Sequence, residues 1–321
     1  MGGIEEFMVR TNPGVDPHLS VWEWQIPIYL FLGGLAAGMM VIGAWQELWG
    51  RGRWESRLSV LGALAALGAL SVGMLALLLD LENPQYVYRF YLAFQPTSPM
   101  SWGAWILLLA YPALALWALI SVNGDALESW ICRFAFLSPL RTLRRAAAGW
   151  STAIRLVVLV VGGALGVYTG ILLQTLVARP LWNSGLLGPL FLASGVSGGA
   201  ALYMLFRGDR STLSVLLKWD VGALVLEALL LGLLLLEKMS GTPLDRLAAA
   251  TLIGGPYTGT FFGLVLVGGI AVPLLMEALE LRNPQRHALF APALVLVGGF
   301  SLRAVLVLAG LATGFQMVAN A

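Results

Sequence analysis

Eight long blocks of apolar residues limit the folds open to this chain. A hydrocarbon core of about 30 Å takes roughly 20 helical residues to cross. Blocks of that length cover residues 24–49, 58–79, 102–122, 154–177, 186–206, 219–236, 257–276 and 288–311. Charged residues make up 11% of the chain, whereas a soluble domain carries about 25%. We therefore expect an all-α, polytopic integral membrane protein with about eight transmembrane helices in a bundle.

Lysine and arginine are distributed unevenly between the loops on the two sides of such a bundle. One side carries twelve of the 19 basic residues: Arg51, Arg53, Arg57, Arg133, Arg141, Arg144, Arg145, Arg207, Arg210, Lys218, Arg282 and Arg286. The other side, which includes both termini, carries five: Arg10, Arg89, Arg179, Lys238 and Arg246. Because basic loops remain in the cytoplasm, we expect both termini on the periplasmic side of a bacterial inner membrane.

This orientation divides the protein into three parts. An outward-facing tail (1–23) precedes the transmembrane domain (24–311), and a second outward-facing tail (312–321) follows it. The longest loop, 123–150, contains an amphipathic basic stretch that we expect to lie along the cytoplasmic membrane surface. In the fourth span, glycine recurs at every fourth position, which favours close approach of a neighbouring helix.

Several cofactors are excluded by the residues that the sequence lacks. Cys132 is the one cysteine, so the chain alone holds no disulfide, cysteine-ligated zinc or iron–sulfur cluster. The two histidines, His18 and His287, fall outside the spans, whereas a transmembrane b-type haem usually takes two axial histidines inside the bundle. We therefore expect no haem and no metal site. Any electrons must come from another subunit and meet a diffusible cofactor here.

Polar side chains gather at the outer ends of the spans. Hydroxyl, amide, carboxyl and aromatic groups from three spans and one loop share a similar depth: Gln25, Tyr29, Asp80, Glu82, Tyr168, Gln174, Arg179 and Trp182. Gln25 and Tyr29 are four residues apart and so share a helix face. A quinone needs such a mixed site, because its carbonyls accept hydrogen bonds, its ring packs on aromatics and its reduction consumes protons. His18, close by in sequence, is a candidate proton donor.

Simpler readings of the same residues stay open. Tyr29 and Tyr168 also fit the aromatic belt found at membrane–water interfaces. Asp80 and Glu82 also fit solvated loop acids, and His18 an ordinary loop residue.

The start of the third span adds a further element to this outer cluster. Ser98 is a favoured N-cap residue and Pro99 a favoured first-turn residue, so we expect a helix to begin there. The partial positive charge of a helix N-terminus would then stabilise negative charge developing on a reduced quinone.

Ionisable residues deeper in the spans are costly to bury and so are functional candidates. Glu227 and Arg303 lie at a similar depth, and they form either a structural ion pair or part of a route for protons. Asp220, seven residues before Glu227, lies on roughly the same helix face and extends that route. Four further charged residues read as surface anchors: Glu277, Glu280, Arg282 and Arg286.

Four segments of the sequence resemble the NrfD/PsrC family, the membrane subunits of polysulfide reductase and related complexes. They are residues 29–38, 94–105, 168–182 and 302–310, spread from the first span to the last. The stretch PTSPMSWGAW within the second segment is the most specific of them.

This resemblance implies a fold, a cofactor and partners. Such subunits have eight or more transmembrane helices, contain no haem, and bind a quinone, menaquinone or ubiquinone, near the periplasmic face. A ferredoxin-like iron–sulfur subunit with 4Fe–4S clusters docks there and connects to a catalytic subunit, commonly of the molybdopterin type.

The resemblance also points to individual residues. Tyr168 matches a quinone-contacting tyrosine, Arg303 matches an arginine of the last helix, and Glu82, with Asp80 as its rival, matches an acid after the second helix. The first helix departs from the pattern: Ile26 and Tyr29 stand where polysulfide reductase has asparagine and histidine.

We therefore expect a quinone-binding membrane subunit of a bacterial respiratory oxidoreductase, incomplete as an enzyme by itself. Its quinone-contacting residues would be Gln25, Tyr29, Ser98, Tyr168 and Trp182, and its proton-carrying residues would be Asp80, Glu82, His18, Asp220, Glu227 and Arg303. Two other functions stay open: a secondary transporter, which would suit the intramembrane charges, and a passive membrane anchor without quinone chemistry.

Overall fold

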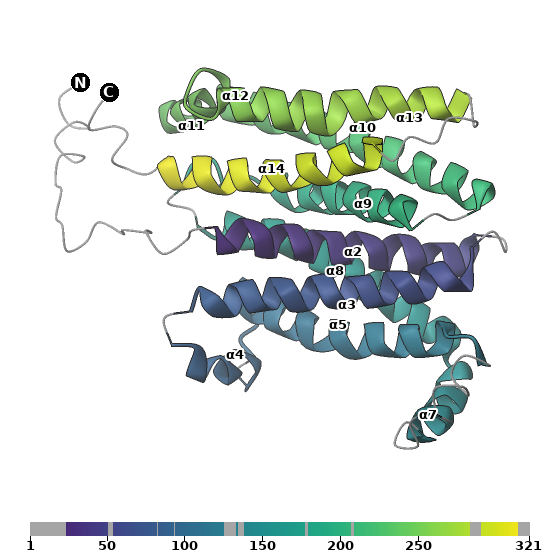
Figure 1. Ribbon diagram of the computed structural model, residues 1–321. Helices are drawn as coiled ribbons and strands as arrows, with labels where there is room; N and C mark the ends of the chain where they lie inside the picture. Colours follow the sequence, from purple (N-terminus) through teal and green to yellow (C-terminus); the bar gives the residue numbers. More distant parts are fainter. Residues whose placement is uncertain are drawn as a thin grey trace.

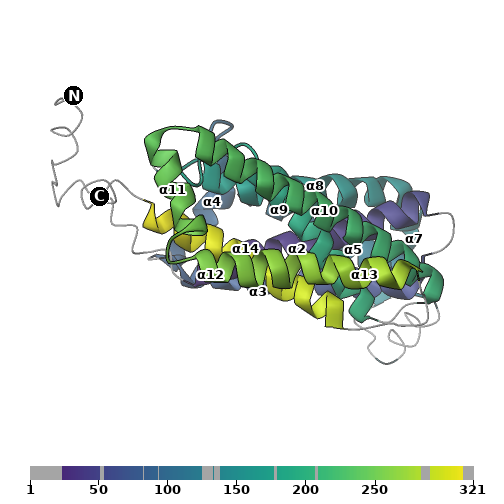
Figure 2. The same cartoon turned by 90° about the horizontal axis from the view of Figure 1, so that it is seen from above.

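A computed structural model describes residues 24–50, 54–81, 83–92, 94–124, 133, 138–176, 179–206, 209–282 and 290–313. In this part of the protein, eight helical segments are long and apolar enough to cross a membrane. They lie side by side in one all-helical bundle (Figures 1 and 2). The expected polytopic all-α membrane fold is thus confirmed. Two candidate site residues, His18 and Glu82, lie outside the described residues.

Seven of the eight spans are continuous α-helices. They are α2 (Gln25–Trp49), α3 (Ser56–Leu79), α5 (Pro99–Ser121), α8 (Ser151–Gln174), α9 (Leu187–Leu205), α10 (Arg210–Ser240) and α14 (Phe290–Ala312). The seventh span in sequence order is composite: a short α12 (Thr258–Thr260), a π-helix (Phe261–Ala271) and α13 (Val272–Arg282).

The sixth span is much longer than the sequence predicts. Instead of residues 219–236, α10 covers 31 residues, which at about 1.5 Å per residue exceeds a hydrocarbon core of about 30 Å. Its first turns carry Arg210 and Lys218 and so read as a loop, but Leu216 and Leu217 on the same turns are buried in the core. Apolar packing on one face therefore extends the helix beyond its apolar block.

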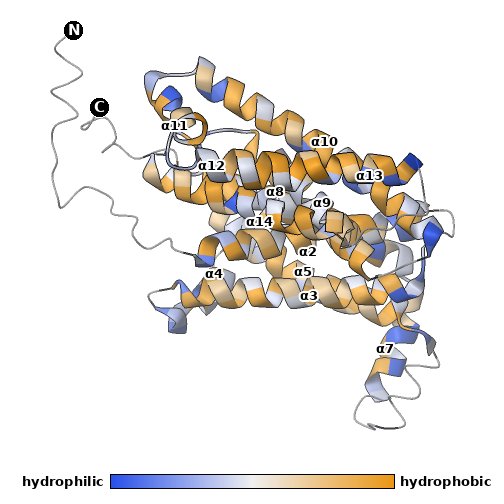
Figure 3. Ribbon diagram, turned by 45° about the horizontal axis from the view of Figure 1, so that its top comes forward, coloured by the Kyte–Doolittle hydropathy of each residue, from blue (hydrophilic) through white to orange (hydrophobic). Residues whose placement is uncertain are grey.

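Within the described residues, three shorter helices lie in the connections between spans, and two of them were not predicted. The unpredicted ones are α4 (Tyr88–Leu92), which follows a 3₁₀ turn (Pro84–Tyr86), and α11 (Pro243–Ile253). The third, α7 (Ser138–Ala148), belongs to the loop for which an amphipathic stretch was expected. Figure 3 shows hydrophilic residues on α7 and along parts of the connections, with hydrophobic residues over the outer faces of the spans.

The two ends of the bundle are distinguished by these connecting helices. Figure 1 shows α4 and α11 at one end, the α4 end, and α7 at the other, the α7 end. The arginines of α7 therefore lie together at one end of the bundle, as expected for basic residues assigned to one side of the membrane. That the α7 end faces the cytoplasm remains a prediction.

Close approach of helix backbones holds the middle of the bundle together. Helices α2 and α9 are the most enclosed of the spans, and they meet through glycines. A methyl group added to Gly38 of α2 would overlap the carbonyl oxygen of Gly195, and one on Gly199 would lie 2.6 Å from the Gly38 carbonyl carbon. The glycine face predicted for α8 also packs closely: a methyl group on Gly162 would lie 2.7 Å from the Met40 side chain of α2.

We predict that Gly38→Ala destabilises the bundle, because the added carbon meets backbone rather than a movable side chain. Overpacking of this kind costs about 1–3 kcal/mol. The matched control is Gly163→Ala, since nothing lies within 4 Å of a carbon added there. Thermal unfolding of the purified complex in detergent, followed by size-exclusion chromatography, should show a lower midpoint for Gly38→Ala alone. Equal midpoints for the two variants would contradict the packing described here.

Candidate functional site

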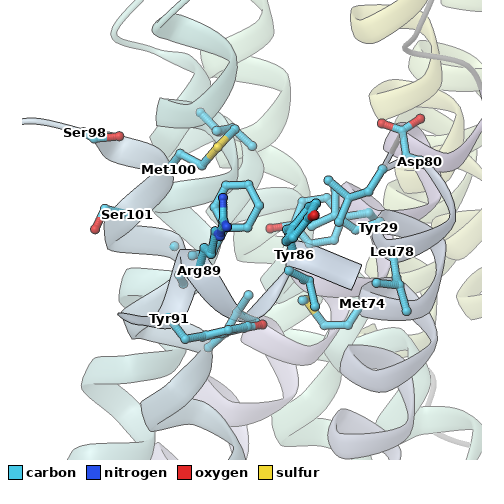
Figure 4. A pocket seen from close by; sticks show the side chains of 18 of the residues that line it. Tyr29, Met74, Leu78, Asp80, Tyr86, Arg89, Tyr91, Ser98, Met100 and Ser101 are labelled. Carbon is cyan, nitrogen blue, oxygen red and sulfur yellow. The ribbon is translucent and has the colours of Figure 1, made fainter. Parts of the chain in front are cut away.

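A cavity of about 1110 Å³ opens at the α4 end, between α2, α3, α4, α5 and α8. Most of its lining is aliphatic or aromatic. The polar side chains that line it are Tyr29, Ser71, Asp80, Asn83, Tyr86, Arg89, Tyr91, Gln95, Ser98, Ser101 and Tyr168. Figure 4 shows Tyr29 and Asp80 on one side of this cavity and Ser98 and Ser101 on the other. Such a lining, mostly apolar with a few polar groups, is typical of a small-molecule site.

Two buried tyrosines form the inner part of the cavity. The phenol groups of Tyr29 on α2 and Tyr168 on α8 lie within hydrogen-bonding reach of each other. Gly103 of α5 makes room for this pair, because any side chain at that position would overlap the Tyr168 ring. The sequence predicted both tyrosines at this depth, but nothing in its spacing showed that they touch.

The segment between α3 and α5 forms the outer part of the cavity. The Arg89 guanidinium lies 4.4 Å from the ring centre of Tyr86, a cation–π contact that favours this arrangement of the two side chains. Burial raises the pKa of the Tyr91 phenol, and Tyr111 raises it further, so Tyr91 presents a neutral hydroxyl group. These three residues were not predicted as site residues, because their segment reads in the sequence as a short connection without structure of its own.

The N-terminus of α5 completes this outer part. The helix begins at Pro99 with Ser98 as its N-cap residue, which confirms the predicted start. The Ser98 side chain makes no capping hydrogen bond. Local bonds instead fold the preceding residues onto the helix: the Gln95 N–H donates to Ser101 Oγ (3.0 Å), and Trp102 Nε1 donates to the Pro96 carbonyl (2.7 Å).

The structure brings together some of the predicted quinone-contacting residues and separates others. Tyr29, Ser98 and Tyr168 line the cavity together with Asp80. Gln25 and Trp182 are not among the lining residues.

Each of these two residues has a different environment. The Gln25 side-chain oxygen is buried without a hydrogen-bond partner among the described residues. Trp182 is fully buried and donates from Nε1 to the Leu306 carbonyl at 2.8 Å. Its indole lies against Gly310 of α14, where any side chain would overlap it.

A second set of polar residues lies inside the bundle, between α9, α10 and α14. Arg303 is buried and donates to Ser194 Oγ (3.0 Å) and to the carbonyls of Gly299 (2.9 Å) and Phe191 (3.1 Å). Among the described side chains, Arg303 and Glu227 make no direct ion pair. The Ser194 hydroxyl connects them instead, since Glu227 is also within its hydrogen-bonding reach.

The expectation that Glu277 anchors the protein at the membrane surface is wrong. Its side chain is fully buried, as is that of Asp220, and the two carboxyl groups are within hydrogen-bonding reach of each other. Glu277 read as an anchor because it follows the apolar block 257–276. The helix continues to Arg282, however, and its face with Glu277 turns towards α10.

A buried lysine, also missed from the sequence, ties the loop before α9 to α10 and α11. Lys238 Nζ donates to the Asn183 carbonyl (2.7 Å) and lies 3.4 Å from Asp245 Oδ1. Asp245 and Thr242 form a capping box at the start of α11. Burial alone would raise the pKa of Asp245, but hydrogen bonds from Thr242 and the charge of Lys238 lower it below its usual value. This contact holds the loop that carries Trp182.

We predict that Asp245→Asn loosens this loop and α11 at neutral pH. The variant removes the negative charge opposite Lys238 and weakens the cap, a loss of about 1 kcal/mol. Hydrogen–deuterium exchange of the complex should therefore speed up severalfold in peptides covering 182–187 and 242–253. Asp209→Asn is the control, because Asp209 begins α10 without a side-chain capping bond. Unchanged exchange in the Asp245 variant would show that the contact stabilises neither segment.

Comparison with known proteins places this protein among related sequences. A family model described as "Polysulphide reductase, NrfD" matches residues 12–315. A polysulfide reductase chain from Wolinella succinogenes is 28% identical over 305 residues, which cover 90% of the present sequence and 94% of that protein. Protein NrfD of Escherichia coli is 27% identical over 304 residues, covering 90% and 95%. A selenate reductase subunit from Mesobacillus selenatarsenatis is 26% identical over 253 residues, covering 70% and 58%.

Proposed function

The chain belongs to the NrfD family of membrane subunits of reductase complexes, and we propose that its cavity at the α4 end binds the headgroup of a quinone. On this proposal the subunit exchanges electrons between an iron–sulfur partner and the quinone pool, with menaquinone or ubiquinone as the cofactor. The partner is a ferredoxin-like subunit with 4Fe–4S clusters, which docks at the α4 end and connects to a catalytic subunit of the molybdopterin type.

The neighbouring phenol groups of Tyr29 and Tyr168 in a mostly apolar cavity are the observation that carries this proposal. A quinone headgroup has two carbonyl oxygens that need donors, and hydroxyl groups belong to the lining residues Tyr29, Tyr168 and Ser98. Its tail needs apolar walls, which Met74, Leu78 and other aliphatic residues of α3 supply. The residues present therefore fit such a group.

The side chains around the cavity divide into positioning and proton-carrying groups. A bound quinone supplies a ring that exchanges two electrons together with two protons. Tyr168, seated against Gly103, orients one carbonyl by hydrogen bonding, and Tyr29 holds Tyr168 in place. Asp80 lines the cavity close to its outer edge and can pass protons between the carbonyl oxygens and water. Glu82 remains a second candidate for this role, and His18 a third.

Coupling to proton movement is a further part of the proposal. Arg303 lies against Gly34 of α2, one to two turns from Tyr29, so it stands between the cavity and the polar residues of α9 and α10. Through Ser194 it reaches Glu227, and Asp220 lies two turns further towards the α7 end. These buried groups form a discontinuous polar line from the cavity into the other half of the bundle.

We predict that Tyr168→Phe weakens quinone binding to the purified complex by about threefold to tenfold, the value of one lost hydrogen bond. Asp80→Asn should leave binding near wild type and slow quinol-driven electron transfer by about 100-fold, as expected for loss of a proton-transfer group. Tyr257→Phe, a tyrosine remote from the cavity, is the control. Quinone titration and stopped-flow reduction of the iron–sulfur partner measure the two effects.

Each rival function makes a different prediction for the same assays. A passive anchor would show no quinone binding in the wild type. A secondary transporter would show solute uptake by the protein reconstituted alone. Either result would overturn the proposed quinone site.

We predict that Glu227→Gln lowers the number of protons moved per electron while quinone affinity stays within about twofold. The variant keeps a hydrogen-bonding side chain next to Ser194 but removes the ionisable group from the polar line. Complexes reconstituted in vesicles with a pH-sensitive dye inside would report this ratio. An unchanged ratio would exclude Glu227 from the proton route.

A further inference from the structure

Two carboxyl groups meet inside the bundle, apart from the cavity. Asp220 lies on α10 and Glu277 on α13, and both side chains have an exposed fraction of 0%. Their carboxyl groups are within hydrogen-bonding reach of each other. The Ser197 hydroxyl of α9 donates to Asp220 Oδ1 at 2.5 Å. Helices α9, α10 and α13 thus enclose the pair on three sides.

No basic side chain neutralises this pair among the described residues. The second oxygen of Asp220 and both oxygens of Glu277 are buried and have no hydrogen-bond donor there. The charged groups that face the pair are acidic: Glu227 acts on Asp220, and Glu280 acts on Glu277. The positive charge of Arg303 acts on Glu227, the neighbour of Asp220 on α10.

Electrostatics decides the protonation of such a pair. Two carboxylates in contact, enclosed by protein and without a cation, cannot both be ionised. One proton between them removes the repulsion and supplies the missing donor, since a protonated carboxyl group donates to its ionised neighbour. A permanently ionised pair or a bound metal would need further partners, and the described residues around the pair do not offer them.

We propose that Asp220 and Glu277 form a proton-holding site that keeps one shared proton inside the bundle and exchanges it with water. The proton leaves from Asp220 on the side of Glu227 and is replaced from the α7 end, so each transfer moves one proton and no electron. Ser197 and Ser194 lie three residues apart on α9. Ser197 contacts Asp220, and Ser194 contacts Glu227. The presence of a shared proton at this site does not depend on the proposed function. The use of that proton during turnover rests on the proposed function.

The helix that carries Glu277 is suited to such exchange. The π-helix Phe261–Ala271 ends two residues before Pro273, and the Val272 N–H bonds to the Val267 carbonyl, five residues back. Proline has no N–H, so the hydrogen-bond pattern changes from π to α at this point. Glu277 lies four residues after Pro273 and so close to this change of pattern, and π-helical segments of this kind are frequent at functional sites.

Infrared spectroscopy of the whole complex in nanodiscs tests the site without any quinone added. At neutral pH the wild type should show a protonated-carboxyl stretching band that shifts in D₂O within the time of buffer exchange. Asp220→Asn and Glu277→Gln should each remove or shift this band, and the surface control Glu55→Gln should leave it unchanged. If an amide variant fails to assemble, Glu277→Asp keeps a carboxyl group and should move the band.

Three results would overturn the proposal: no such band in the wild type, a band that neither amide variant nor Glu277→Asp changes, or a band that never shifts in D₂O. The last would indicate a structural proton that does not exchange. Because no quinone takes part, failure here is independent of failure in the quinone-binding assays.

Discussion

The contact between the α2 and α9 backbones is the constraint on which the rest of the structure depends. Gly38, Gly195 and Gly199 let the two helices approach until their backbones are in direct contact. In a bilayer, where lipid tails are as apolar as leucine, such close packing supplies much of the force that holds helices together. It also sets the position of Tyr29 on α2 and of Ser194 and Ser197 on α9, so the cavity and the buried polar line share one rigid support.

Much of the architecture follows from the sequence because the bilayer imposes simple rules. Apolar length fixed the number of spans, and the Ser98–Pro99 pair identified where α5 begins. Residue type and depth also placed Tyr29, Asp80 and Tyr168 at one end of the bundle, where they line one cavity. These inferences depend on local chemistry, on helix geometry or on the thickness of the membrane.

The remaining features depend on contacts between distant segments, which periodicity does not report. Glu277 looks like a surface residue by its place after an apolar block, yet α10 covers it. Lys238 has its partners in two other segments, and Arg303 reaches Glu227 through a serine rather than directly. The first turns of α10 are helical because Leu216 and Leu217 pack in the core, although their polar neighbours read as a loop. Trp182, predicted beside the quinone from its position, faces α14 instead.

Photoaffinity labelling of the purified complex with a quinone analogue that carries a reactive group on its ring is the most direct measurement of where a quinone binds. Mass spectrometry then identifies the labelled peptides. We expect labelling within 71–107, which includes α4 and the start of α5, or beside Tyr29 and Tyr168, with competition by unmodified quinone. Competed labelling confined to α10, α13 or α14 would contradict the proposed site, as would the absence of any competed label.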